Sequence, residues 1–332
     1  MDQALTLNML NAEGRKVTIK QLQVSKGMKT LGVTLAPDGN NKDIVQALLE
    51  KASEWADLIQ SGHPLLREEA WRALNSTILK GLEYPLLATT LTEEETEIIF
   101  SPIRQAALPK SGIVRTFPKA MTHAPLSHQG LGIPNVYTSQ QVQHILTVLK
   151  HGGTNTITGN LITQSLELLK MEIGISRPLH DINFKKISHL ATNSWVKNTW
   201  LFMEEHNLEI NEEPQFMLLR ERDAYLMDIS YDSEVPTHFF PAINRCRLFR
   251  KILTLSDLFT GQGNKVRSYL WTPKHYLLHD DRTNWPLQGT PTKSDWNKWT
   301  KCLIGMLEIR AKDASMNPKY WLGNGSVTNT WK

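Results

Sequence analysis

The stretch from Pro37 to Ile59, PDGNNKDIVQALLEKASEWADLI, marks the point where the chain changes from a strand-like to a helix-like pattern. After turn-forming residues at 37–40, apolar side chains recur three or four positions apart, which is the spacing of one face of an α-helix. They are Ile44, Leu48, Ala52, Trp55, Leu58 and Ile59. The sequence therefore predicts a helix here, capped by Asn40 or Asn41, and a different structure before it.

Residues 1–35 have the alternating pattern of β-strands. Leu5, Leu7 and Met9 alternate with polar residues, and Val17 and Ile19 alternate again after turn-forming residues between the two runs. Two alternating runs around a turn are typical of a β-hairpin. A further strand is predicted over residues 28–35.

Helical spacing continues through most of the remaining chain. A second helix is predicted around residues 71–82, ending near Pro85, and a third begins at Thr92. The Thr92 hydroxyl and Glu95 have the spacing of a capping box, in which each side chain accepts a hydrogen bond from the other residue's backbone N–H. Residues 108–135 are rich in Pro and Gly and predict an ordered loop. Later helices are expected over 139–150, 161–173, 193–206 and 245–259.

The predicted fold class is therefore mainly α, of the α+β type. A short N-terminal hairpin or strand region is followed by a helical bundle and by a helical, loop-rich C-terminal region. The expected divisions are 1–36, 37–150, 151–260 and a Trp-rich, loop-rich region over 261–332. Four of the ten tryptophans lie between Trp271 and Trp299. They are interpreted as buried anchors, with stacking on nucleic-acid bases as the alternative.

Length and composition indicate a protein with a sizeable core. The chain has 332 residues, of which 40% are apolar, a net charge of +4 and two cysteines. Its longest apolar runs fall far short of the roughly 20 residues of a membrane span, and its amino end lacks the pattern of a signal peptide. We therefore expect an intracellular protein, nuclear or cytoplasmic and not secreted, that has no membrane partner. Cys246 and Cys302 are expected to be free thiols.

Charge is distributed unevenly along the chain. From Ser101 to Leu166 there is no Asp or Glu, although Lys and Arg recur throughout this stretch. A positive surface of this kind suits a polyphosphate backbone, but an acid-free stretch is also compatible with a partly buried segment. A second acid-free run, 235–256, predicts one basic helix face, with an ordinary solvated helix surface as the alternative.

Residues that could support catalysis are few. Asp280-Asp281 is the only adjacent pair of aspartates, and it lies in a polar turn that would not hold two carboxylates rigidly around a metal ion. His275 and His279 have helix spacing, but a metalloprotease glutamate and a third ligand are missing. The cysteines lack the spacing of a zinc or redox motif. The residues predict a non-catalytic chain without a cofactor.

A series of short motifs gives the sequence a recognisable order. They are Lys29–Val33 (KTLGV), Leu35–Asn41 (LAPDGNN), Glu54–Ala56 (EWA), Glu69–Trp71 (EAW), Leu82–Pro85 (LEYP) and Gly130–Asn135 (GLGIPN). In this order and spacing they resemble reverse transcriptases of non-LTR-type retroelements, in the portion that follows the catalytic centre. Weaker similarities at 189–192 (HLAT), 244–247 (NRCR) and 255–257 (LSD) extend the resemblance over nearly the whole chain.

The resemblance implies that residues 1–36 end a palm-like domain and that 37–150 form a thumb-like domain that holds a duplex by its backbone. Gly32 would allow a close approach of backbone or nucleic acid, or would merely relieve crowding in a strand. The implied contact residues are Lys29, Gly32, Arg104, Lys110, Arg115, Lys119, Arg245, Arg247, Arg250 and Lys251. The implied partner is an RNA or DNA duplex or hybrid.

The chain also departs from the family that it resembles. The family's palm carries an Asp-Asp turn and a further aspartate that hold metal ions, and nothing of this kind precedes Lys29. Mg²⁺ would belong to the missing palm, so this chain is not expected to polymerise DNA.

We therefore expect a non-catalytic C-terminal fragment of a retroelement reverse transcriptase that binds RNA or DNA without sequence preference. Two alternatives stay open. The chain could be a structural or protein-interaction remnant without nucleic-acid binding, or a gene-model fragment of an intact RNA-directed DNA polymerase. A protein partner and the oligomeric state are left undefined.

Overall fold

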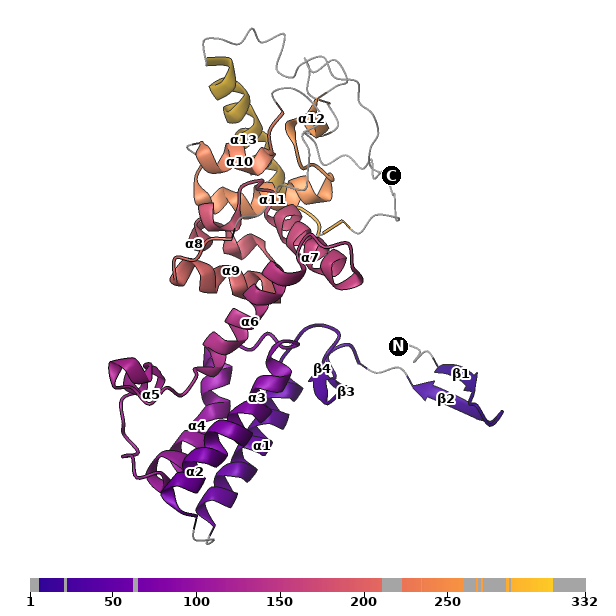
Figure 1. Cartoon of the computed structure of the whole chain (residues 1–332). Coiled ribbons are helices and arrows are strands. Elements are labelled where there is room, and N and C mark those ends of the chain that lie inside the picture. The colour runs from indigo at the N-terminus through magenta and orange to yellow at the C-terminus, as the bar shows by residue number, and fades with distance from the viewer. Residues whose placement is uncertain are drawn as a thin grey trace. The chain divides into compact units, whose positions relative to one another are not determined.

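The structure is a computed structural model that describes residues 6–20, 23–61, 65–210, 223–233, 235–259, 267, 270, 285–286 and 288–312. It is mainly helical, with a short strand region at the start of the chain, so the predicted fold class is confirmed (Figure 1). The chain divides into two compact units, Met1–Thr147 and Val148–Lys332, and each is described by itself. The finer divisions predicted at 36, 150 and 260 stay predictions.

The strand region begins with the predicted hairpin. Strands β1 (Thr6–Leu10) and β2 (Lys16–Lys20) pair antiparallel, with Leu7 opposite Ile19 and Met9 opposite Val17. The Asn11 side chain accepts hydrogen bonds from the backbone N–H groups of Glu13 and Arg15 and so closes the turn. Alternation and turn residues were sufficient to predict this element.

The single strand predicted over residues 28–35 is wrong, because the chain folds back on itself there. Strands β3 (Met28–Thr30) and β4 (Val33–Leu35) form a second antiparallel hairpin. Both turn residues have positive φ, 49° at Leu31 and 87° at Gly32. Two successive positive values suit the right-handed twist of the flanking strands, which is why such turns favour glycine. The turn is tied to the helices by the Tyr84 hydroxyl, which donates to the Leu31 carbonyl at 2.8 Å.

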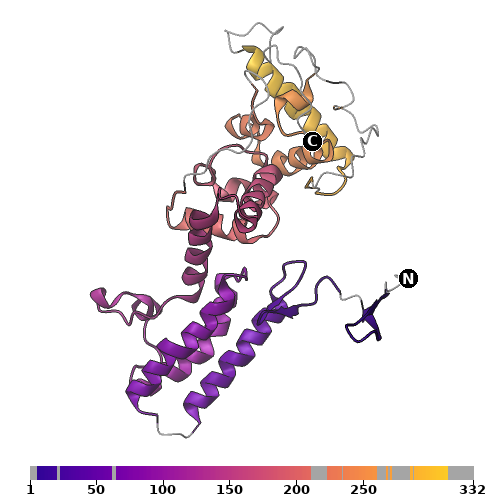
Figure 2. The same ribbon diagram turned by 45° about the vertical axis from the view of Figure 1, so that its right-hand side comes forward.

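Helices form the body of the first unit. They are α1 (Lys42–Gln60), α2 (Arg67–Ala73), a π-helical turn (Leu74–Ile78), α3 (Leu79–Leu86) and α4 (Glu93–Lys110). Figures 1 and 2 show α1 running alongside α4, and α2 also contacts α4. The predicted apolar face of α1 lies in the core, except that Leu58 is 59% exposed. The predicted stop near Pro85 is confirmed.

The start of α4 has the capping box that the sequence predicted. The Glu95 carboxylate accepts from the Thr92 N–H at 2.8 Å, and the Thr92 hydroxyl accepts from the Glu95 N–H at 3.2 Å. After α4, an ordered loop carries the short α5 (Lys119–His123) and a 3-10 turn (Leu126–His128), and then α6 (Val136–His151) begins.

The second unit has its own helices and its own core. The helices are α7 (Ile157–Ile173), α8 (Phe184–Ile187), α9 (Trp195–Glu205), α10 (Leu226–Asp232), α11 (Phe240–Phe249), α12 (Leu255–Leu258) and α13 (Lys293–Lys312). The helix predicted over 245–259 is wrong as one element, because a turn with Lys251 at φ 53° separates α11 from α12. Trp200, Phe240 and Trp299 are among the largest buried side chains.

Tryptophans 296 and 299 are buried anchors, as the sequence predicted. The Trp299 indole N–H donates to the Leu270 carbonyl at 3.0 Å, which satisfies its polar atom in the core. Trp271, Asp280-Asp281, His275 and His279 lie outside the described residues.

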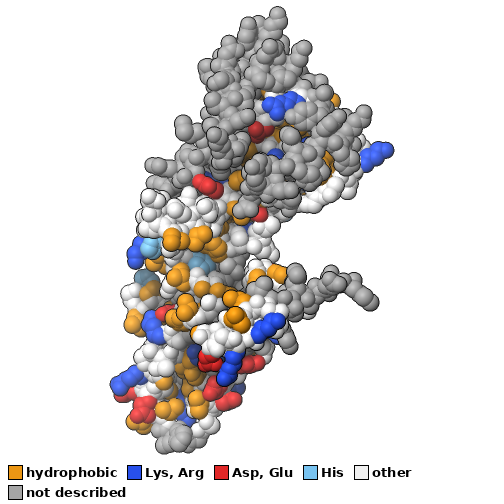
Figure 3. Space-filling model, turned by 90° about the vertical axis from the view of Figure 1, so that its right-hand side faces the viewer, with side chains coloured by type: hydrophobic (Ala, Val, Ile, Leu, Met, Phe, Trp, Pro, Cys, Tyr) orange, Lys and Arg blue, Asp and Glu red, His pale blue; other side chains and the backbone are white. Residues whose placement is uncertain are grey.

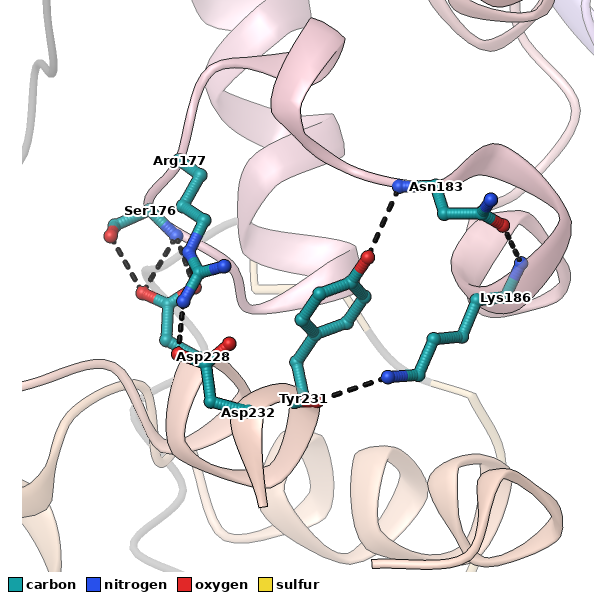
Figure 4. A network of polar contacts seen from close by, with 7 residues as sticks. All are labelled: Ser176, Arg177, Asn183, Lys186, Asp228, Tyr231 and Asp232. Carbon is teal, nitrogen blue, oxygen red and sulfur yellow. Dashed lines mark hydrogen bonds and ion pairs between the residues drawn. The ribbon is translucent and has the colours of Figure 1, made fainter. Parts of the chain in front are cut away.

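Helix α10 is fastened by a polar network (Figure 4). The Asp228 carboxylate accepts from the Ser176 hydroxyl at 2.6 Å and from its N–H, and Arg177 pairs with Asp232. Burial raises the pKa of Asp228, and the Ser176 hydrogen bonds oppose this effect. On the other side of the helix, Lys186 donates to the Tyr231 carbonyl and stands 3.8 Å from the centre of its ring. These contacts join α10 to α8 and to the segment between α7 and α8.

Both cysteines are free and buried, as predicted. Burial raises the pKa of the Cys302 thiol to about 11 and that of Cys246 further, so both are protonated at neutral pH. Among the described residues, no helix is long and apolar enough to cross a membrane.

Candidate nucleic-acid interface

The predicted contact residues fall into separate groups. Lys29 and Gly32 lie in the β3–β4 hairpin, where both are exposed. Gly32 would place an added Cβ at 3.6 Å from the Tyr84 ring, which is an ordinary contact distance. Relief of crowding is therefore not what requires glycine at position 32. The positive φ of the turn is what favours glycine there.

Arg104 and Lys119 form a second group, and both are engaged by one carboxylate. Arg104 lies 2.6 Å and Lys119 2.8 Å from the same Glu97 oxygen. Burial opposes the ionisation of Glu97, but hydrogen bonds from the two cations and their charges outweigh it and lower the pKa of this carboxyl. Glu97 and Lys119 line a cavity of about 730 Å³, and Glu93 and Glu94 line the same cavity. Neutralised cations beside further carboxylates are poor partners for a phosphate.

Replacing Glu97 by glutamine should have a pH-dependent effect on stability. The pKa of Glu97 is lowered in the fold, so its stabilisation is present above the ordinary value of 4.5 and disappears as the pH falls through the lowered pKa. Because Glu97 and Lys119 are exposed to solvent in part, we expect Glu97→Gln to lower the free energy of unfolding at neutral pH by at most about 1 kcal/mol. Urea unfolding at neutral pH and in acid measures this. A difference that persists unchanged in acid would contradict the assignment.

Lys110 and Arg115 belong to a third group that holds unpaired cations. Lys110 ends α4 and Arg115 follows in the loop, and neither forms an ion pair with a described residue. Two further arginines, Arg67 and Arg72 on α2, also have no ion-pair partner among the described residues. Gly112, in the turn after α4, lies directly against the Arg67 guanidinium, since an added Cβ would be 3.1 Å from its Nε. The structure thus brings the start of α2 to the end of α4.

Arg67 and Arg72 were missed because Glu68 and Glu69 stand between them in the sequence. In the structure the Glu69 carboxylate does not pair with either arginine, because it accepts a hydrogen bond from the Leu66 N–H at 2.9 Å. The signal available in the sequence was helical spacing, which places residues 67, 68, 71 and 72 on one side of α2.

The rest of the first unit is not uniformly basic. On the face shown in Figure 3, acidic side chains (red) stand among basic ones (blue) in the lower part of the molecule. On α1, Glu50, Glu54 and Asp57 are exposed and line one shallow hollow. A polyanion would be repelled there, which leaves the group around the end of α4 as the better surface.

In the second unit, Arg247 must be removed from the predicted contact set, because it is fully buried. Its guanidinium donates to the carbonyls of Met171 and Glu172 at 2.6 and 2.7 Å and to Asn244 Oδ1 at 2.8 Å. Burial lowers its pKa to about 9, so it remains charged at neutral pH. A cation at the C-terminal end of α7 satisfies carbonyls that the helix leaves open and complements the helix dipole. Arg247 therefore holds the fold.

The neighbouring cations are also engaged within the second unit. Arg245 pairs with Asp295 at 2.7 Å, and the Arg250 guanidinium lies 5.0 Å from the Trp296 ring centre. Lys251 is partly buried in the turn after α11. The single basic helix face predicted over 235–256 is wrong, because its cations point to different partners around α11.

The Gly-Leu-Gly segment also has a structural role. Gly130 lies against the Ala124 carbonyl so closely that an added Cβ would be 2.1 Å from its oxygen. The next three residues donate backbone hydrogen bonds into α5 and its end: Leu131 to Met121, Gly132 to Ala124 and Ile133 to Thr122. Two of the motifs that carry the resemblance, this one and the Leu31-Gly32 turn with Tyr84, thus make specific contacts within the first unit.

Among the described residues, no three His, Cys, Asp or Glu side chains come together to hold a metal ion. A comparison of the chain with models of protein families, with curated proteins and with solved structures found no match. The similarity to reverse transcriptases therefore rests on the motifs alone.

Proposed function

We propose that this chain is a non-catalytic C-terminal part of a retroelement reverse transcriptase that binds RNA or DNA duplexes or hybrids through their phosphate backbone. The observation that carries the proposal is the group of cations at the end of α4 that form no ion pair with any residue that the structure describes. Lys110 and Arg115 were predicted contacts, and the fold brings Arg67 and Arg72 to the same end of the first unit. Such a protein would act in the nucleus or the cytoplasm.

Phosphate binding favours these cations for an electrostatic reason. When a cation without a carboxylate partner neutralises a phosphate, the counterions condensed on the nucleic acid are released, and no ion pair within the protein is lost. Arg104 and Lys119 would first have to leave Glu97. Lys29 is exposed on the β3–β4 hairpin and also has no ion-pair partner among the described residues. Among the contacts predicted from the sequence, we therefore assign the main ones to Lys110, Arg115 and Lys29.

The non-catalytic part of the proposal follows from the sequence, in which no apolar Asp-Asp hairpin accompanies the motifs of the resemblance. No cofactor is assigned to this chain.

Removing two unpaired cations tests the proposal. Lys110→Ala/Arg115→Ala should weaken binding of an RNA–DNA hybrid about tenfold at low salt, irrespective of its sequence. Fluorescence anisotropy with a labelled hybrid measures this effect on the full chain.

The matched control is Arg15→Ala/Lys80→Ala, which removes the same formal charge from cations that face Glu13 and Glu83. It should bind nearly as the wild type does. Equal losses in the two double variants would show that only the total charge matters, and a wild-type chain that binds no hybrid would refute the proposed function.

A further inference from the structure

Helix α2 and the turn after α4 line an open pocket of about 570 Å³. This volume lies in the range of small-ligand sites. Its walls combine cationic, aromatic and aliphatic side chains: Arg67, Trp71, Arg72, Ser111, Ile113 and Leu131. These residues come from three segments that are far apart in the sequence, so the pocket is a product of the fold.

We propose that this pocket takes one unpaired nucleotide at the end of a nucleic-acid strand, with its phosphate at the arginines and its base against Trp71. The inference rests on the proposed function and deepens it, because it names where on the protein a strand end binds and requires that end to be unpaired.

The phosphate part follows from the two guanidiniums. Arg67 and Arg72 are exposed and without an ion-pair partner among the described residues. Gly112, at φ 82°, lets the Arg67 side chain lie flat against the turn, because a Cβ would come within 3.2 Å of its Cζ. A guanidinium can donate two parallel N–H groups to the oxygens of one phosphate.

The base part follows from Trp71 and its aliphatic neighbours. Trp71 packs against the core of the first unit and is partly exposed. Ile113 and Leu131 complete an apolar wall beside it. An aromatic face next to cations is the usual platform for an unpaired base, and it accepts any base because every base has a π-face.

Two further groups limit what the pocket can hold. Ser111 lines the pocket, and its Oγ is buried and has no hydrogen-bond partner among the described residues. Glu68 lies in the same lining and offsets one of the two positive charges. The remaining charge suits one phosphate group and not a run of phosphates. A paired base would also have its faces covered by stacked neighbours, so the pocket favours an unpaired end.

The test compares two labelled RNA–DNA hybrids, one blunt and one with a short single-stranded overhang. The wild-type chain should bind the overhang hybrid about tenfold more tightly at the same salt concentration. Trp71→Leu should abolish this preference, and Trp71→Phe should retain most of it because the ring remains. Arg67→Ala/Arg72→Ala should also reduce the preference, whereas Arg15→Ala/Lys80→Ala should leave it unchanged. Circular dichroism of each variant confirms that the chain is folded.

The possible outcomes separate the two proposals. Tight binding of both hybrids without a preference for the overhang would overturn the pocket assignment and leave the proposed function in place. A preference that survives in Trp71→Leu would also overturn the assignment. Failure of the wild type to bind either hybrid would refute both. Displacement of the overhang hybrid by polyglutamate as effectively as by a single-stranded oligonucleotide would show that the pocket recognises acidic peptides instead.

Discussion

Replacing Gly174 by alanine is expected to lower the free energy of unfolding of the second unit by about 3–5 kcal/mol. Gly174 follows α7 with φ 72°, a value that costs a residue with a side chain about 1–2 kcal/mol. An added Cβ would also lie 2.5 Å from Arg247 Cζ. Arg247 cannot swing away cheaply, because it is fully buried and its departure would leave the carbonyls of Met171 and Glu172 without partners.

Gly153→Ala is the matched control for this prediction. Gly153 has the same φ of 72° and lies in the same unit, but an added Cβ would meet nothing within 4 Å. Gly153→Ala should lower the free energy of unfolding only through the strain of a positive φ, by about 1–2 kcal/mol. Urea unfolding followed by circular dichroism gives both values. Equal losses of unfolding free energy in the two variants would show that the Arg247 side chain moves away from an added Cβ without destabilising the fold.

Gly130→Ala is expected to release the loop that follows α5. The added Cβ would lie 2.1 Å from the Ala124 oxygen, and backbone atoms cannot move aside as the end of a flexible side chain can. The hydrogen bonds from Leu131, Gly132 and Ile133 should therefore break, and Ile133 should leave the core. Loss of a buried isoleucine and these bonds corresponds to about 3–5 kcal/mol.

Amide hydrogen exchange tests this prediction locally. In Gly130→Ala, the amides of residues 131–133 should exchange much faster than in the wild type, while those in the middle of α1 remain protected. Gly39→Ala is the control, because Gly39 has φ 75° and open space around it. It should leave residues 131–133 protected. Unchanged exchange in Gly130→Ala would contradict the tight fit.

Much of the fold was predictable because local patterns agree with it. The apolar spacing from Ile44 to Ile59 gave α1, and the Thr92–Glu95 spacing gave the start of α4. The β3–β4 hairpin was missed because a leucine at positive φ contradicts the local preference that sequence reasoning uses. Tertiary contacts compensate at that turn, including the hydrogen bond from Tyr84.

The candidate interface was less predictable, because charge in a sequence does not say which cations are already paired. Arg104 and Lys119 share Glu97, which stands just before the acid-free stretch. Arg247 is in a basic run but serves the end of α7, more than 70 residues earlier in the chain. Arg67 and Arg72 stand beside acids and yet are unpaired among the described residues. Only the three-dimensional contacts distinguish these cases.

The central claim is backbone-directed binding of nucleic acid, and the most direct test is the salt dependence of hybrid binding by the full wild-type chain. We expect measurable affinity at low salt for hybrids of unrelated sequence. The logarithm of the binding constant should fall linearly with the logarithm of salt concentration, with a slope of about −0.9 for each phosphate neutralised. Contacts from Lys29, Lys110 and Arg115 would give a slope of about −3. Absence of binding at low salt, or an affinity that does not change with salt, would contradict the account.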